Sequence, residues 1–331
     1  MAEEQQERLP RRERAQLRIS GYGLIGNFEL RRLLQSLDLE WRTRQFFDAN
    51  FIEDSALILL SSLERDGYLR PEVSVEMTLE DGVMVTNRWT TLLDPPLPRP
   101  FQARAVHFRL DRGVLYQFDD IEVVDSTEFD EEEVRAFFVE RGALIPLRRT
   151  RIFTPDRLER GLANVTEALN RLGYENALVT ATNIVQNHQD GTVDLTIVVE
   201  EGARVMVRSV RTETFVSTNR EPIVVETIQT NVPFSRLWQQ DFAQDIRSTN
   251  FQRGYPDTEV EMSRIREDRI NGTNEIDLLT TVKLGEQITI GEVQFKGLEK
   301  TKESVAHRRV DLDAGDLLNR IEAERGRHRL V

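Results

Sequence analysis

The amino-acid sequence predicts an α+β fold made of several small modules in tandem, each a three-stranded mixed sheet covered by two helices. A block that combines a helical pattern, a Gly-Tyr pair and an alternating strand occurs three times. A further glycine stands at a fixed distance from each new opening strand. In addition, 331 residues exceed the usual size of a single hydrophobic core. We therefore expect separately cored domains in the order strand, helix, helix, strand, strand.

The repeated pairs are Gly67-Tyr68, Gly173-Tyr174 and Gly254-Tyr255. They recur after about 80 to 105 residues, which is longer than a solenoid repeat and is typical of bead-like domains. In the second block, Thr154-Pro155 suits the N-cap and first position of a helix. Gly173 is predicted to end that helix in the left-handed conformation, with Tyr174 folded back onto it. The apolar stripe between these ends is Leu158, Leu162, Val165, Leu169 and Leu172.

A β-hairpin is predicted after each of the later two helices. Strands at 178–186 and 193–200 are joined by turn residues at 188–191, and strands at 258–266 and 275–282 by Asn271-Gly272. A second glycine then precedes the opening strand of the next module. These glycines are Gly113, Gly202 and Gly285, each followed eight positions later by an apolar residue.

These landmarks predict the domain boundaries. Residues 1–15 are expected to be a disordered N-terminal segment, and 16–118 a first domain with an insertion around 83–101 whose proline-rich end, 95–100, forms an extended loop. Residues 119–207 and 208–290 are expected to be the second and third domains. Residues 291–331 are expected to start a further copy that stops within its second helix.

Composition argues against several function classes. Net charge of −13 disfavours nucleic acid as a partner, because phosphate binding requires concentrated positive charge. The chain has no Cys, and its four His residues lack the paired spacing of a metal site. No nucleophile, base and acid set is recognisable. We therefore expect no enzyme activity, no cofactor and no metal.

A rival hypothesis comes from Gly21-x-Gly23-x-x-Gly26, which lies between a strand and a helix like a dinucleotide-binding motif. It would make the protein a Rossmann-type oxidoreductase. The preceding strand, 16–19, alternates between polar and apolar residues, whereas strands of a parallel α/β sheet are nearly continuous in apolar residues. We prefer the interpretation that these glycines turn the chain from the first strand into the first helix.

From Gln16 to Val331 the chain resembles the POTRA domains of the BamA/TamA-like family of outer-membrane protein assembly factors. The matching features are the Gly-Tyr pairs, the Glu-Gly of VVEEGARVMVRSV, and GEVQFKGLEKTKESV, which looks like the start of a further copy. The resemblance implies a non-catalytic, chaperone-like region on the periplasmic side of the outer membrane. The POTRA region of a two-partner secretion transporter is the alternative.

The resemblance also implies partners. These are unfolded outer-membrane protein clients, periplasmic accessory lipoproteins or a TamB-like partner, and a C-terminal β-barrel of the same protein that these residues do not include. Residues 1–16 are charged and lack the apolar stretch of a secretory signal peptide, so we expect a fragment if the protein is exported.

An open sheet edge is the predicted client site, because its unpaired N–H and C=O groups can accept an added strand. The resemblance places the strand after each Gly-Tyr pair at an edge. The candidate residues are Val73, Ser74, Val75, Glu76, Met77, Leu178, Val179, Thr180, Ala181, Thr182, Asn183, Ile184, Glu259, Val260, Glu261 and Met262. The competing interpretation is that charges such as Glu72, Glu76, Glu259 and Glu261 blunt these edges so that they bind nothing.

Overall fold

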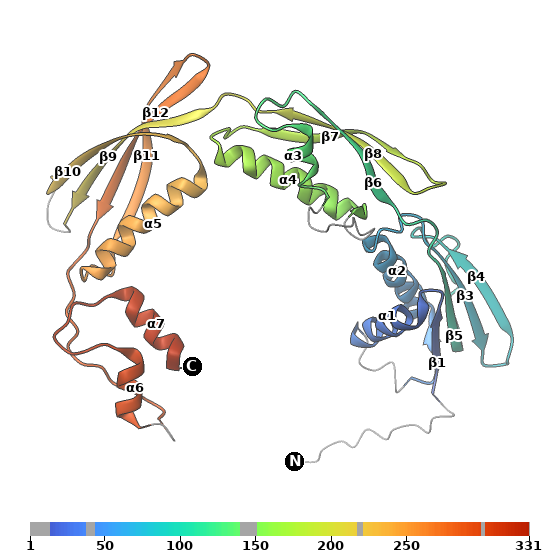
Figure 1. Ribbon diagram of the computed structural model, residues 1–331. Coiled ribbons are helices and arrows are strands. Elements are labelled where there is room, and N and C mark those ends of the chain that lie inside the picture. Colours follow the sequence, from blue (N-terminus) through green and yellow to red (C-terminus); the bar gives the residue numbers. More distant parts are fainter. Residues whose placement is uncertain (1–13, 38–43, 140–150, 217–220, 299–301, 331) are drawn as a thin grey trace. The chain divides into compact units, whose positions relative to one another are not determined.

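The structure is a computed structural model, shown in Figure 1, that describes residues 14–37, 44–139, 151–216, 221–298 and 302–330. Almost all of the predicted N-terminal segment 1–15 lies outside these residues. The chain forms two compact units. The first comprises residues 1–125, 129–164 and 180–198, and the second comprises residues 126–128, 165–179 and 199–331.

The first sheet follows the order β1-β5-β3-β4, with β2 pairing β5. β1 runs parallel to β5, and the pairs β5 to β3 and β3 to β4 are antiparallel. Its strands are β1 (Gln16–Ser20), β2 (Phe47–Asp48), β3 (Glu72–Leu79), β4 (Met84–Trp89) and β5 (Gln102–Asp111).

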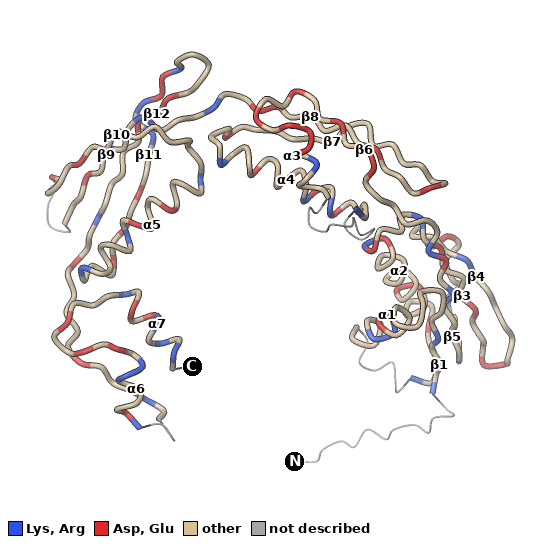
Figure 2. Tube along the Cα trace, viewed as in Figure 1, with Lys and Arg blue, Asp and Glu red and all other residues tan. Residues whose placement is uncertain are grey.

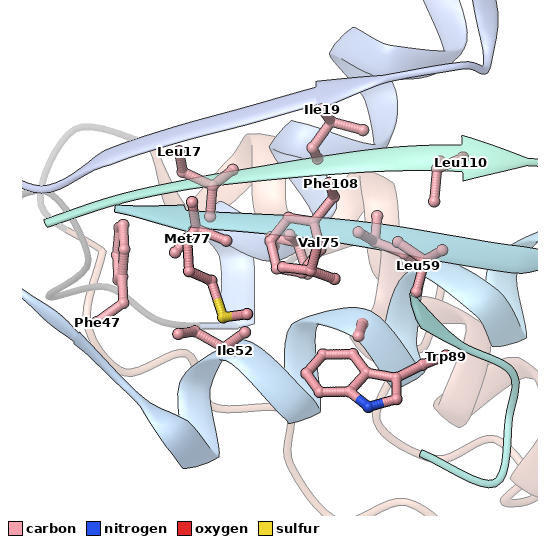
Figure 3. Close-up of a cluster of buried hydrophobic side chains, with 14 of the residues drawn as sticks. Leu17, Ile19, Phe47, Ile52, Leu59, Val75, Met77, Trp89, Phe108 and Leu110 are labelled. Atoms are coloured by element: carbon pink, nitrogen blue, oxygen red, sulfur yellow. The ribbon is translucent and has the colours of Figure 1, made fainter. Parts of the chain in front are cut away.

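Two helices, α1 (Gly23–Leu37) and α2 (Ala49–Arg65), cover one face of this sheet (Figure 1). Asp48 begins α2, because its side chain accepts a hydrogen bond from Phe51 N at 2.8 Å. Alternating side chains of β3 and one stripe of α2 fill the core, as Figure 3 shows for Val75, Met77, Ile52 and Leu59. The alternation of side chains along β3 and the helical spacing along α2 thus place the apolar side chains of both elements at the same interface.

The first third of the insertion predicted around 83–101 forms β4. Asp81-Gly82 is a hairpin turn, with Leu79 N donating to Val83 O at 2.9 Å and Gly82 at φ +83°. β4 ends in Trp89, which is 1% exposed and lies in the core beside α2 (Figure 3). The insertion is therefore part of the first hydrophobic core.

The proline-rich end of the insertion has no helix or strand, as predicted, but it is anchored to α2. Glu53, 8% exposed, accepts a hydrogen bond from Leu97 N at 2.6 Å and pairs with Arg99 at 2.5 Å. A buried carboxylate requires such partners, since an unpaired one would be strongly destabilising.

The second sheet has the order β6-β8-β7, from β6 (Gln117–Val124), β7 (Leu178–Gln186) and β8 (Thr192–Glu200), with β6 parallel to β8. The helices of this module are α3 (Glu131–Arg135) and α4 (Pro155–Arg171). Asp130 and Glu133 form a capping box at the start of α3. Phe118 is fully buried and lies edge-on to Phe138 and Phe153. This module has the predicted topology.

The third sheet has the order β10-β9-β12-β11, with β9 parallel to β12. Its elements are β9 (Val205–Phe215), β10 (Val224–Pro233), α5 (Arg236–Gln252), β11 (Glu259–Ile270) and β12 (Thr273–Lys283). The expectation of two helices is wrong here, because β10 stands where the first helix was predicted. The β-branched run of Val, Ile and Thr from 223 to 232 favours a strand over a helix.

The three sheets share one topology. In each, the opening strand runs parallel to the closing strand, and the strand after the Gly-Tyr pair lies on the other side of that closing strand. The predicted boundaries at 118/119 and 207/208 fall inside β6 and β9, so they are a few residues late. Beyond β12 lie α6 (Glu303–Val310) and α7 (Arg320–Leu330), the two helices expected of a further copy.

Candidate functional site

The Gly-Tyr pairs end the helices as predicted. In all three, the Tyr amide donates to the carbonyl five residues earlier: Tyr68 to Leu63 at 3.1 Å, Tyr174 to Leu169 at 3.0 Å and Tyr255 to Asn250 at 3.0 Å. The glycine before each Tyr has a positive φ, +100° at Gly173. This arrangement is the Schellman motif, which satisfies the last carbonyls of a helix.

The same glycines couple consecutive modules through the main chain. The carbonyl of each accepts a hydrogen bond from a residue at the start of the next module: Gly67 from Tyr116 at 2.9 Å, Gly173 from Val205 at 2.8 Å and Gly254 from Ile288 at 2.8 Å. Each donor lies three residues after one of the glycine landmarks Gly113, Gly202 and Gly285. We call each set of bonds a module junction.

A second bond extends each junction to the next long helix. The carbonyls of Tyr116, Val205 and Ile288 accept from the amides of Phe153, Phe234 and Leu318 at 2.9, 2.9 and 2.8 Å. The next residue in each case caps the helix: the side chains of Thr154, Ser235 and Asn319 each accept a backbone N–H at 3.1 Å. The recurring landmarks of the sequence thus mark one repeated junction.

Polar side chains reinforce the junction that contains Gly173. Glu201, of the Glu-Gly motif, accepts hydrogen bonds from Thr127 N at 2.6 Å, Glu128 N at 2.9 Å and the Thr127 hydroxyl. Burial acts to raise the pKa of Glu201, but these hydrogen bonds outweigh it and hold the pKa below its usual value. Burial, followed by a hydrogen bond to Glu128, raises the pKa of Tyr174 to about 12.

Glu201→Gln is expected to remove a pH-dependent part of the stability. Because the folded-state pKa of Glu201 is lowered from 4.5, its contribution is present above that pH and is lost as pH falls through the folded-state value. We expect a loss of about 1 kcal/mol at pH 7 that vanishes in acid, since solvent screens part of the interaction. Urea unfolding at a series of pH values measures it, and the exposed Glu200→Gln is the control. A difference from wild type that does not change with pH would contradict this assignment.

The first predicted client edge is wrong. β3, which contains Val73, Ser74, Val75, Glu76 and Met77, lies between β5 and β4 and has no free side. The hairpin at Asp81-Gly82 folds β4 onto the side that the prediction left open. That dipeptide between alternating segments is a recognisable hairpin pattern, and it would have identified the extra strand from sequence.

The third predicted edge, β11, ends its sheet but carries many charges. Its charged residues are Glu259, Glu261, Arg264, Arg266, Glu267, Asp268 and Arg269. Both charge colours run along the β11–β12 hairpin in Figure 2. Arg264 pairs with Glu175 and lies over the Phe234 ring, while Arg266 pairs with Asp268 at 2.8 Å. An edge covered in this way matches the blunted interpretation, because an added strand would have to desolvate these charges.

The second predicted edge, β7, also ends its sheet and has no charged residue along Leu178–Gln186. Val179 faces the core, whereas Leu178, Ile184 and Val185 are 53, 43 and 50% exposed. Asn183 has a φ of +49°, which interrupts the regular strand near its end. β7 is thus the predicted edge whose chemistry best suits an added strand.

Other sheet edges were not among the predicted client sites, and two of them belong to strands that the prediction lacked. β4 closes one side of the first sheet and β10 one side of the third. β10 shows three exposed apolar side chains, Val224, Val225 and Ile228, and the exposed Ile223 directly precedes it. Their β-branched pattern was visible in the sequence, but the expectation of a helix at this position concealed it.

The glycine motif at 21–26 has a structural explanation. A Cβ at Gly26 would lie 2.3 Å from the ring of Tyr22, so glycine lets that ring pack over the start of α1. Tyr22 donates its hydroxyl hydrogen to Asp66 and lies edge-on to Tyr68. Of the strand pairs described in the first sheet, only β1 and β5 are parallel, which excludes the parallel dinucleotide-binding fold.

Within the part of the chain that the structure describes, no three His, Asp or Glu side chains gather as a metal site requires. Nor does any helix there combine the length and the apolar character needed to cross a membrane.

Comparison with known proteins agrees with the module topology. Residues 116–202 match the family described as POTRA, surface antigen variable number repeat. No curated protein matches the sequence.

Similar solved structures include POTRA domains 3–5 of Haemophilus influenzae BamA, with 17% identity, a TM-score of 0.41, and coverage of 65% of this chain and 85% of that one. The N-terminal domain of Omp85 from the thermophilic cyanobacterium Thermosynechococcus elongatus shares 14% identity over 82% of this chain and 96% of its own, with a TM-score of 0.32. POTRA domains 1–3 of Anabaena Omp85 share 13% identity over 82% of this chain and 94% of their own, with a TM-score of 0.28.

The matched residues cover the whole second sheet, from the donor of the first junction to Gly202. The sheets before and after them repeat its parallel opening and closing strands, and their junctions repeat its hydrogen bonds. The chain therefore contains a POTRA domain at residues 116–202, and the modules before and after it repeat its strand topology.

Proposed function

We propose that this chain is the periplasmic part of an outer-membrane protein assembly factor, and that it holds unfolded client polypeptides as added β-strands. The assignment of residues 116–202 to the POTRA family supports the setting. The uncharged open edge of β7 is the observation that carries the mechanism. On this proposal the region performs no chemistry itself, and it presents clients, with accessory lipoproteins or a TamB-like partner, to a membrane-embedded part of the same protein.

The physical basis is main-chain pairing. A free strand edge offers a row of N–H and C=O groups, so an extended client gains hydrogen bonds whatever its side chains are. Exposed Ile184 and Val185 add apolar contacts on both faces of the added strand. Such binding is tolerant of sequence, which suits a receptor for many clients.

Ile184→Lys is expected to weaken binding of a labelled peptide of about ten alternating Val and Thr residues by about tenfold, roughly 1.4 kcal/mol. The introduced charge would have to be desolvated beneath the added strand. Fluorescence anisotropy with the full chain measures the dissociation constant. The matched control is Ile265→Lys on charged β11, where the wild-type side chain is 54% exposed. Equal binding by both variants and wild type would exclude β7 as the client edge.

A further inference from the structure

The third module carries an extra strand, β10, beside its opening strand β9, and the described sheets of the other two modules have no strand at that position. β10 pairs with β9 on one side, and no strand of the described residues pairs with its other side (Figure 1). Its pairing with β9 is regular from Val224 to Gln229, before a shift in register near Val232. These six residues offer a regular ladder edge that no described strand occupies.

Between Val224 and Gln229 this edge lacks the usual protection of an exposed strand, since the register shift and Pro233 lie beyond these residues. Natural edges are blunted by charges, by proline or by irregular pairing. Between Val224 and Gln229 the only charged residue is Glu226. On the opposite edge of the same sheet, β11 carries seven charged residues. One edge of the third sheet is thus blunted and the other is not.

Apolar side chains are exposed on both faces of β10. Val224 and Ile228 point to one face and Val225 to the other, because side chains alternate along a strand, and Ile223 directly precedes the strand. Their exposed fractions lie between 44 and 49%. A neighbouring strand with apolar residues on both of its own faces would cover the apolar side chains on both faces of β10, whereas an amphipathic strand would cover those on one face only.

We infer that β10 is a second strand-binding edge, and that its ligand is an extended polypeptide segment rich in Val, Ile and Thr on both faces and free of acidic residues. Glu226 and the preceding Glu221 make a neutral or basic segment the favoured ligand. This inference rests on the proposed function, since both require client strands, but it assigns a different edge and a different sequence preference from β7.

The test uses the full chain and a labelled peptide of about ten Val, Ile and Thr residues, with apolar side chains on both faces, between paired lysines. Ile228→Lys is expected to weaken its binding at least about tenfold, and Val224→Lys serves as a second variant at the same edge. Ile265→Lys on β11 and Ile25→Lys on α1 are expected to bind as wild type does. Ile25 is 76% exposed, so its variant controls for nonspecific hydrophobic binding of the peptide. Circular dichroism and unfolding midpoints establish that each variant is folded.

A peptide N-methylated at alternate residues keeps its side chains but loses half of its ladder hydrogen bonds. Equal binding of this peptide would overturn strand addition at β10, and so would binding that only Ile184→Lys weakens, which leaves the proposed function intact. If the wild-type chain bound neither this peptide nor the alternating Val-Thr peptide, the inference for β10 and the proposed function would both be overturned. Concentration-dependent dimers that Ile228→Lys abolishes, without peptide binding, would assign the edge to a second copy and overturn the client assignment.

Discussion

Gly173→Ala is expected to destabilise the chain by about 3 kcal/mol, because glycine is required there for two separate reasons. The residue has a φ of +100°, which L side chains rarely adopt, and an added Cβ would lie 2.7 Å from Val205 O. That oxygen is main chain, so it cannot move aside as a side chain would. The junction at Gly173 would therefore break or shift, and the midpoint of urea unfolding measures the loss.

Gly272→Ala is the matched control for this prediction. Gly272 has a similar φ of +87°, but an added Cβ there would meet nothing within 4 Å. The control is expected to cost only the conformational strain, about 1 kcal/mol. The difference between the two variants gives the loss of stability that the steric clash at the junction causes. Equal losses would show that the close approach to Val205 O does not contribute to the destabilisation.

Trp89→Ala is expected to destabilise the first module by about 3 to 5 kcal/mol, the usual cost of removing a large buried aromatic side chain. Trp89 is 1% exposed, and its indole N–H donates to Pro95 O at 2.7 Å. The substitution thus leaves a cavity beside α2 and also removes one of the hydrogen bonds that hold the proline-rich loop. Thermal unfolding, monitored by the far-UV circular dichroism of the backbone, measures the change in stability.

Leu92→Ala provides the comparison within the same insertion. Leu92 is 85% exposed, and its truncation is expected to change stability by less than about 0.5 kcal/mol. Similar effects of the two substitutions would mean that the insertion does not belong to the first core.

Local chemistry explains which parts of the fold could be predicted from sequence. The start of α4 at Thr154-Pro155 and its end at Gly173 depend on capping groups within one helical turn, so the residues themselves identify them. The turn at Asn271-Gly272 is likewise local, with both residues at positive φ. The repeat of such signals was enough to predict the module and its tandem arrangement.

The errors arose where neighbours decide the structure. Whether β3 is an edge depends on the partner that covers it, and the chain supplies β4 only through the Asp81-Gly82 hairpin. The segment that became β10 was assigned to a helix by analogy with the second module, although its β-branched residues favour a strand. Client edges are therefore harder to predict than modules, because an edge is defined by the absence of a neighbour.

The module junctions have a consequence for how such chains change in evolution. Their recurring bonds join amide and carbonyl groups, which every residue but proline possesses, and their glycines contribute no side chain. A duplicated segment could join its predecessor without any newly matched surface. Gene duplication or deletion in whole repeats should thus be tolerated far more readily than loss of a single junction glycine.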